Sequence, residues 1–144
     1  MIMEAKTIIN QNLIKEYSGS GLTKKNLTPY IETAISALSV IKKFIKIDRE
    51  SMAKSSDNTS YSLVLRLRSC YIVECLIKSK KWTNREFIRL AKEISGSNRA
   101  YEGYLRVKDG QKKINELPSI EAEAIYNYVQ NGIKRHQIWL TKRK

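Results

Sequence analysis

Residues 61–110 read YSLVLRLRSCYIVECLIKSKKWTNREFIRLAKEISGSNRAYEGYLRVKDG, and this stretch decides the fold. Wound as a helix, residues 61–79 are apolar on nearly every side, which is typical of a helix buried at the centre of a domain. Thr83-Asn84-Arg85-Glu86 has the spacing of a capping box, so a second helix is expected to begin there and to end at Ser95-Gly96. A short helix over about 98–108 then stops at Asp109-Gly110.

The flanking sequence predicts further helices. An amphipathic helix is expected near residues 8–17, and another is expected to start at Thr28, with Pro29 in its first turn. Residues 48–60 are polar and predict a frayed helix end followed by a surface loop, and the last helix is expected over about 118–138. Its inward positions are expected to be Ile120, Ala124, Ile125, Tyr128, Val129 and Ile133. The expected architecture is therefore all-α: one domain over residues 1–144, a bundle of five or six helices.

Charge is the most unusual feature of the composition. The 144 residues include 27 Lys and Arg against 14 Asp and Glu, a formal net charge of +13. Such an excess favours an anionic partner, namely RNA, DNA, a nucleotide or an acidic protein, although a lysine-rich solvated surface explains it equally well. A homodimer is also compatible with the sequence. The N-terminal residues have the character of neither a signal peptide nor a membrane span, so we expect a cytoplasmic protein without a membrane partner.

The residues that usually carry chemistry are sparse. Cys70 and Cys75 point in different directions on one expected helix and predict reduced thiols, and with a single histidine they do not make a zinc site. His136 is expected to be an ordinary surface or helix-end histidine. We find no paired carboxylates and no nucleophile–base set, so no catalytic residue, metal or cofactor is expected. Whether the protein is an enzyme stays open, with a non-catalytic role favoured.

Three charged residues lie inside the apolar central helix. Arg66 and Glu74 stand on one face, separated by Cys70, while Arg68 points in nearly the opposite direction. Charges in such a helix are costly unless they are paired or line a cleft. A buried ion pair that holds helices in register is the favoured interpretation, and a ligand-facing cleft is the alternative.

The short helix over 98–108 offers a second set of candidates. Tyr101, Tyr104, Arg106 and Lys108 alternate rings with cations, a pattern that suits stacking on bases and contact with phosphates, but also ordinary packing. Residues 83–108 also have the spacing of a helix-turn-helix, which would present Asn98, Arg99 and Arg106 to a DNA groove. The full set of candidate ligand-binding or nucleic-acid-binding residues is Arg66, Arg68, Glu74, Arg99, Tyr104, Arg106 and Lys108.

A resemblance covers about a third of the chain. Leu65-Arg66-Leu67-Arg68, Tyr71 to Leu76, the Thr83–Glu86 helix start and Ala100 to Gly110 together resemble the helical domain that follows the catalytic domain in archaeal minimal nucleotidyltransferases. That domain belongs to the HEPN group of helical nucleotide-binding domains. The resemblance implies a bundle that binds a nucleotide or RNA, or that serves a nucleotidyltransferase partner. The chain has neither a nucleotidyltransferase domain nor the Arg-polar-x₃₋₅-His motif of the ribonuclease members.

The two leading hypotheses differ in an observable way. The first is a non-catalytic binding domain of the HEPN type, and the alternative is a small helix-turn-helix regulator that uses residues 83–108. A regulator should expose Arg99 and Arg106 on one ridge, whereas a HEPN-like domain should bury the helix over 98–108 against the bundle.

Overall fold

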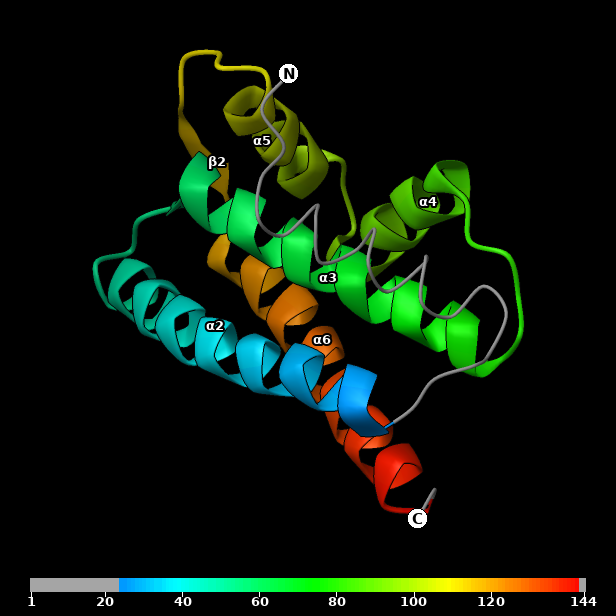
Figure 1. Ribbon diagram of the computed structural model, residues 1–144. Helices are drawn as coiled ribbons and strands as arrows, with labels where there is room; N and C mark the ends of the chain where they lie inside the picture. Colours follow the sequence, from blue (N-terminus) through cyan, green and yellow to red (C-terminus); the bar gives the residue numbers. More distant parts are fainter. Residues whose placement is uncertain (1–23, 143–144) are drawn as a thin grey trace.

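The computed structural model describes residues 24–142, and these form five helices and a two-stranded sheet (Figure 1). The prediction of an all-α bundle is confirmed. The elements in chain order are α2 (Lys24–Glu50), β1 (Ser55–Ser56), α3 (Asp57–Ile77), α4 (Asn84–Ser95), α5 (Arg99–Lys108), β2 (Asn115–Leu117) and α6 (Ser119–Lys142). The helix expected near residues 8–17 lies outside the described residues.

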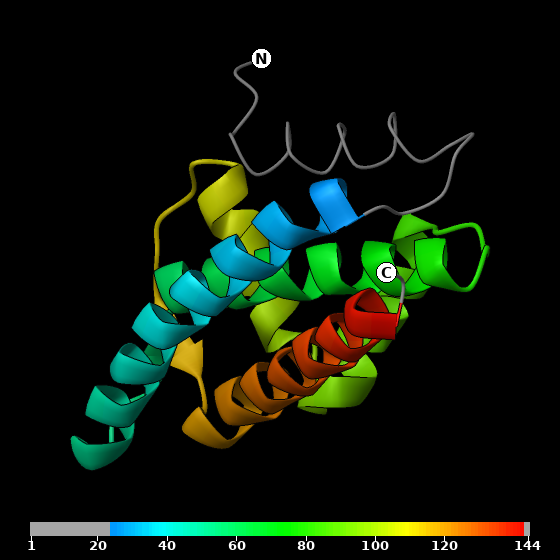
Figure 2. The ribbon, with the colours of Figure 1, turned by 60° about the horizontal axis from the view of Figure 1, so that its bottom comes forward.

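Helix α3 occupies the middle of the bundle, as its apolar circumference predicts. Figure 1 shows α3 between α2 and α6 on one side and α4 and α5 on the other. Leu63, Leu67 and Val73 of α3 have no exposed surface and belong to one continuous hydrophobic core. Helices α2 and α6 run side by side and antiparallel (Figure 2), since α2 meets α6 through Tyr30–His136 near its start and Arg49–Glu123 near its end.

The start of α3 corrects the prediction of a surface loop over residues 48–60. Helix α2 continues to Glu50, and β1 pairs antiparallel with β2. Ser56 then caps α3, accepting a hydrogen bond from the Thr59 N–H at 3.3 Å. Asp57 is only 1% exposed. A polar stretch could be buried here because distant parts of the chain supply its hydrogen-bond partners, which periodicity in the sequence does not reveal.

The start of α2 also differs from the prediction. The helix begins at Lys24 instead of being capped by Thr28, so Pro29 lies inside it. The extra turn carries Leu27, which is completely buried in the core. Burial of that side chain offsets the backbone hydrogen bond that a proline within a helix removes.

The ends of α4 and α5 agree with the prediction. The Glu86 N–H donates to Thr83 Oγ1 at 3.1 Å, and α4 stops at Gly96, whose φ of 90° is left-handed. Tyr71 of α3 completes this cap: its hydroxyl accepts from the Thr83 N–H at 3.3 Å and donates to Glu86 Oε2 at 3.1 Å. The start of α4 is thereby fixed to α3.

One residue of α6 that was expected to face the core is exposed instead. Ile120 is 77% exposed, whereas the neighbouring Glu121 is buried. The first turn of α6 presents Glu121 to the bundle because Arg99 and Ser97 bind its carboxylate there. Within residues 24–142, no helix has the combination of length and apolar character needed to cross a membrane.

Candidate ligand-binding cleft

Helices α3, α4 and α6 enclose an open cleft of about 420 Å³, here called the α3–α4–α6 cleft. Charged side chains and tyrosines dominate its walls. Its lining residues are Tyr71, Glu74, Cys75, Lys78, Lys80, Glu86, Arg89, Leu90, Glu93, Tyr128 and Arg135. Of the residues singled out in the sequence as ligand-binding candidates, Glu74 is the one that lines this cleft.

Glu74 accepts hydrogen bonds from two residues of α6 and lies near a lysine that follows α3. Its Oε1 accepts from Arg135 Nε at 3.0 Å and from His136 Nε2 at 3.1 Å, and Lys78 Nζ lies 3.8 Å from Oε2. Burial acts to raise the pKa of Glu74, but the hydrogen bond from Arg135 and the neighbouring positive charges outweigh burial, so the pKa lies below its usual value. Glu74 is therefore a carboxylate at neutral pH and acts as a hydrogen-bond acceptor.

His136 corrects the expectation of a surface histidine, because it is 1% exposed. Its Nδ1 lies 3.1 Å from the Tyr30 hydroxyl and its Nε2 faces Glu74. Burial lowers the pKa of His136, and the carboxylate of Glu74 only partly opposes that effect. The neutral tautomer that fits carries its proton on Nε2, donates to Glu74 and accepts from Tyr30. Both ring nitrogens are thus occupied within the protein.

The remaining cations of the cleft are more accessible. Arg135 is half-exposed, and its guanidinium lies 6.0 Å from the centre of the Tyr128 ring. Lys80 approaches Glu86 at 3.7 Å. Arg89 on α4 is exposed and forms no ion pair with any residue between 26 and 142. The cleft therefore offers positive charge that is not fully neutralised, next to aromatic rings.

Proton or thiol chemistry has little support here. Burial raises the pKa of the Cys75 thiol that lines the cleft, and it raises the pKa of Cys70 behind it to about 12. Both cysteines stay protonated at neutral pH and are poor nucleophiles.

The structure separates Arg66 from Glu74. Arg66 is 4% exposed, and its Nε has no hydrogen-bond partner. Burial lowers the pKa of this guanidinium, although Tyr30 opposes that effect. Arg66 and Glu74 therefore do not pair with each other; the ion pair that joins helices here is formed by Glu74 of α3 and Arg135 of α6. The positions of Arg66 and Glu74 on one face of a helix do not indicate which residue of another helix pairs with Glu74.

Arg68 is engaged in packing between α3 and α4. Its guanidinium lies over the rings of Trp82 and Phe87, at 5.4 and 5.6 Å from their centres. Its NH1 group donates to Asn84 Oδ1 at 2.9 Å. These contacts fix the start of α4 and leave Arg68 outside the α3–α4–α6 cleft.

The candidates on α5 point into the bundle or along its edge. Tyr104 is 8% exposed and stacks between Tyr61 and Tyr101, with ring centres 5.4 and 5.7 Å away. Lys108 is exposed, and its ammonium lies 5.9 Å from the centre of the Tyr104 ring. The alternation of rings and cations that suggested base stacking thus forms an aromatic stack inside the fold.

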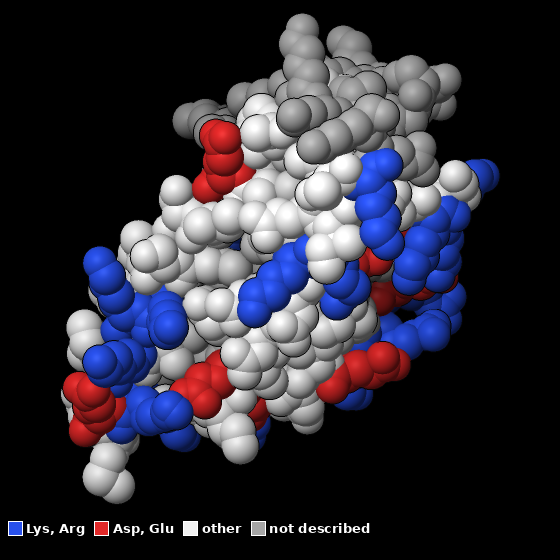
Figure 3. Space-filling model, turned by 90° about the horizontal axis from the view of Figure 1, so that it is seen from below, with Lys and Arg blue, Asp and Glu red and all other residues white. Residues whose placement is uncertain are grey.

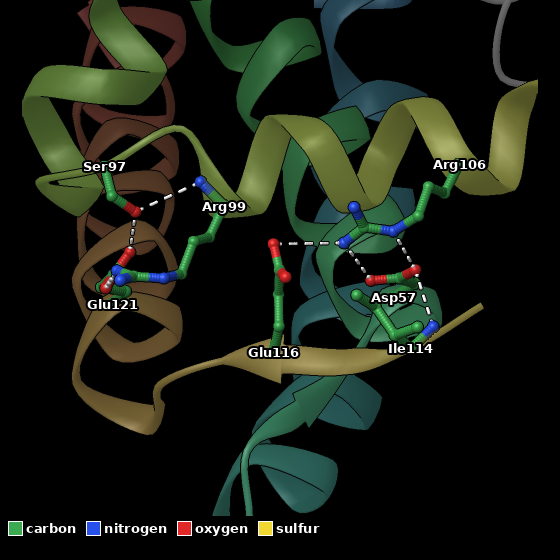
Figure 4. Close-up of polar contacts among 7 residues, drawn as sticks. All are labelled: Asp57, Ser97, Arg99, Arg106, Ile114, Glu116 and Glu121. Atoms are coloured by element: carbon green, nitrogen blue, oxygen red, sulfur yellow. Dashed lines mark hydrogen bonds and ion pairs between the residues drawn. The ribbon is translucent and has the colours of Figure 1, made fainter. Parts of the chain in front are cut away.

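Arg106 and Arg99 are both bound to carboxylates (Figure 4). Arg106 makes a bidentate pair with Asp57, with Nε–Oδ2 at 2.7 Å and NH2–Oδ1 at 3.0 Å, and also reaches Glu116 at 3.3 Å. Arg99 lies 2.9 Å from Glu121 Oε2. The ridge of free arginines that a helix-turn-helix regulator needs is not formed, and α5 packs against α3.

Sequence reasoning did not identify the main cations of the cleft. Arg135 pairs with Glu74 across 61 positions of the chain, and no short-range pattern indicates such a contact. Helical periodicity indicates only that Arg89 is exposed, because it lies two positions from Phe87, which faces the core; Arg85 has the same relation to Phe87 and does not line the cleft. Among the described residues, no group of three or more His, Cys, Asp and Glu side chains is placed to hold a metal ion.

Comparison of the chain with protein-family models, with curated proteins and with solved structures finds no match.

Proposed function

We propose that the protein is a non-catalytic helical binding domain that receives the phosphate of a nucleotide or of RNA in the α3–α4–α6 cleft. The observation that carries the proposal is the grouping of four cations, Lys78, Lys80, Arg89 and Arg135, around one cleft. Arg89 is the most important of the four, because its guanidinium forms no ion pair with a carboxylate of the described residues. An incoming phosphate supplies the negative charge that pairs with Arg89.

The carboxylates of the cleft cancel only part of the charge of these four cations. Glu74 is already engaged by Arg135 and His136, and Glu86 by Tyr71 and Lys80. Glu93 also lines the cleft, so four cations face three carboxylates and one positive charge remains. A phosphate therefore competes for cations whose own side chains are at least half exposed, where an ion pair contributes little. The net charge of +13 adds long-range attraction for any polyanion.

The tyrosines suit the rest of a nucleotide. Tyr71 and Tyr128 line the cleft beside the cations, and burial raises the pKa of both phenols, so they remain neutral. A neutral ring next to a guanidinium offers a face for a base or ribose while the cation contacts the phosphate.

A role beside a nucleotidyltransferase is part of the proposal. Its support is the resemblance of residues 65–110 to the helical domain of archaeal minimal nucleotidyltransferases, together with the packing of α5 against α3 that such a domain requires. In this role the cleft holds the nucleotide or RNA substrate, and the partner supplies the metal-binding carboxylates that transfer needs.

The cleft is tested by titrating fluorescent ATP and a short RNA into the full chain and into two variants, Arg89→Ala and Arg85→Ala. The two arginines lie on α4 and are both exposed, but Arg89 lines the cleft and Arg85 does not. Loss of a charged hydrogen bond should weaken binding about tenfold for Arg89→Ala and less than about twofold for Arg85→Ala. Equal losses in the two variants would exclude the cleft as the site.

Salt dependence and partner binding complete the test. Binding to phosphate should weaken markedly between about 50 and about 200 mM salt. Co-purification with a nucleotidyltransferase encoded beside this chain tests the accessory role separately. Nucleotide binding without co-purification would support the nucleotide site in the cleft and exclude the accessory role. Co-purification without nucleotide binding would support the accessory role and exclude the nucleotide site.

A further inference from the structure

We propose that the groove between α2 and α6 is a docking site for an acidic amphipathic helix of a partner protein. Two adjoining hollows of about 460 and 370 Å³ lie along this groove, and Lys42 and Tyr126 line both of them. Figure 3 shows this face of the molecule as largely uncharged surface, with Lys and Arg side chains and fewer Asp and Glu side chains along its borders. The inference is independent of the α3–α4–α6 cleft, which opens between other pairs of helices.

The floor of the groove is apolar and has the periodicity of helix packing. Leu38, Ile45 and Ile133 form buried parts of the floor, and Ile35 is 47% exposed at one end. On α2 the lining positions 35, 38, 42, 45 and 49 recur every three or four residues, as in the seam of a helical bundle. A third helix laid along that seam would bury this apolar row.

The length of the groove matches a helix of four turns. Ile35 and Glu50 mark its ends on α2 and are 15 positions apart. At 1.5 Å per residue this separation is about 22 Å, which an amphipathic segment of about 16 residues spans. A shorter extended peptide would not place side chains at the same three- and four-residue intervals.

Charge identifies the chemistry of the occupant. Lys42, Lys46 and Lys134 border the groove and form no ion pair with any residue between 26 and 142. Arg49 is paired with Glu123 at 3.0 Å and closes one end. Glu50 lies at the same end and forms no ion pair with any residue between 26 and 142, so three free lysines outnumber one free carboxylate along the groove. A helix with carboxylates flanking its apolar stripe complements this excess of positive charge.

A second copy of the chain fits this surface poorly. Two copies meeting through the groove would bring their lysine rims together, and each copy carries a net charge of +13. Like charges across an interface oppose association. With an acidic partner, neither the lysine rim nor the net charge meets a like charge.

The test uses a fluorescently labelled peptide of about 18 residues, with leucines at helical spacing and glutamates on both flanks, long enough to span the groove at 1.5 Å per residue. A peptide of the same composition in scrambled order is the control. Fluorescence anisotropy with the full chain should give binding at least about tenfold tighter for the amphipathic peptide, because only that peptide presents a continuous apolar stripe. Equal binding of the two peptides would show general attraction to a basic protein and would overturn the proposal.

Two matched pairs of variants locate the binding. Lys42→Glu should weaken the amphipathic peptide about tenfold, while Lys43→Glu, on the adjacent exposed residue outside the groove, should change it less than about threefold. Ile35→Asp and Val40→Asp form the apolar pair: both residues are about half exposed, but only Ile35 lines the groove. Thermal melting of each variant checks that it is folded.

The outcomes separate the alternatives. Equal losses within either pair would overturn the proposal. Sedimentation that shows a dimer of this chain, broken by Ile35→Asp, would assign the groove to a second copy instead. Arg89→Ala, which removes a cation of the α3–α4–α6 cleft, should leave peptide binding unchanged, so failure of the proposed nucleotide site and failure of this groove are distinguishable.

Discussion

Asp57 and Glu74 lie at opposite ends of α3, and each pairs with an arginine from a later helix. The Asp57–Arg106 pair is closed: Asp57 is 1% exposed, Arg106 is bidentate, and the Ile114 N–H also donates to Asp57 Oδ2 at 3.0 Å. The pair formed by Glu74 and Arg135 borders the cleft, where half of the Arg135 side chain meets solvent. A carboxylate–arginine pair is thus shielded from solvent at one end of α3 and partly exposed at the other.

The difference follows from which elements surround each carboxylate. Around Asp57, α5 and β2 approach so closely that a Cβ atom on Gly103 would lie 2.9 Å from Asp57 Oδ1 and 2.9 Å from Ser60 Cβ. Around Glu74, the helices α4 and α6 diverge and leave the cleft open. A buried pair is costly to break, whereas an exposed pair contributes little to stability but stays available to a ligand.

The largest expected effect is loss of the closed pair. Asp57→Ala leaves Arg106 without its main partner and Ile114 N–H without an acceptor, so the free energy of unfolding should fall by about 3–5 kcal/mol. Urea unfolding measures this loss. Asp109→Ala, on an exposed aspartate at the end of α5, is the control and should change stability by less than about 0.5 kcal/mol. Similar losses in both variants would contradict the distinction.

Close packing at the same end gives the next effect. Gly103→Ala inserts a methyl group against Asp57 and Ser60 and should cost about 1–3 kcal/mol, despite the higher helix propensity of alanine. Glu102→Gly and Glu102→Ala, at an exposed position of the same helix, both lack the carboxylate, so the difference between them measures the propensity gain from glycine to alanine. If Gly103→Ala stabilised the protein by that same difference, α5 would not lie as close to α3 as described.

The cleft end should show the pH dependence of a buried neutral histidine. The pKa of His136 is lowered from 6.5 in the folded protein, so below pH 6.5 the unfolded chain takes up a proton that the folded chain resists. Stability should therefore fall as the pH drops from 6.5 towards the lowered pKa of the folded state. His136→Gln should lose this slope, and an unchanged slope in the variant would place the titration on another group.

Much of the fold was predictable from local patterns, whereas the partners of its charges were not. The apolar circumference of residues 61–79 and the Thr83 cap of α4 depend on neighbours within a few positions, and both are confirmed. The second half of the expected capping box is not formed, because the Thr83 N–H donates to Tyr71 instead of to Glu86. Asp57 meets Arg106 across 49 positions and Glu74 meets Arg135 across 61. Such contacts follow from how helices pack, so a single sequence indicates that Glu74 needs a partner without saying which residue supplies it.

The smallest expected effect compares the two ion pairs directly. In a double-mutant cycle, Glu74→Ala and Arg135→Ala should show a coupling energy of about 0.5–1 kcal/mol. The coupling is small because the arginine is half exposed, so water solvates its charge when the carboxylate is removed. The cycle of Asp57→Ala and Arg106→Ala should give at least about 2 kcal/mol, since both partners are shielded. Arg135→Ala alone should change the free energy of unfolding by less than about 1 kcal/mol while weakening nucleotide binding. A coupling energy at the cleft as large as that at Asp57 would mean that Arg135 is committed to the fold, and the charge available to a ligand would then rest on Arg89 and the two lysines.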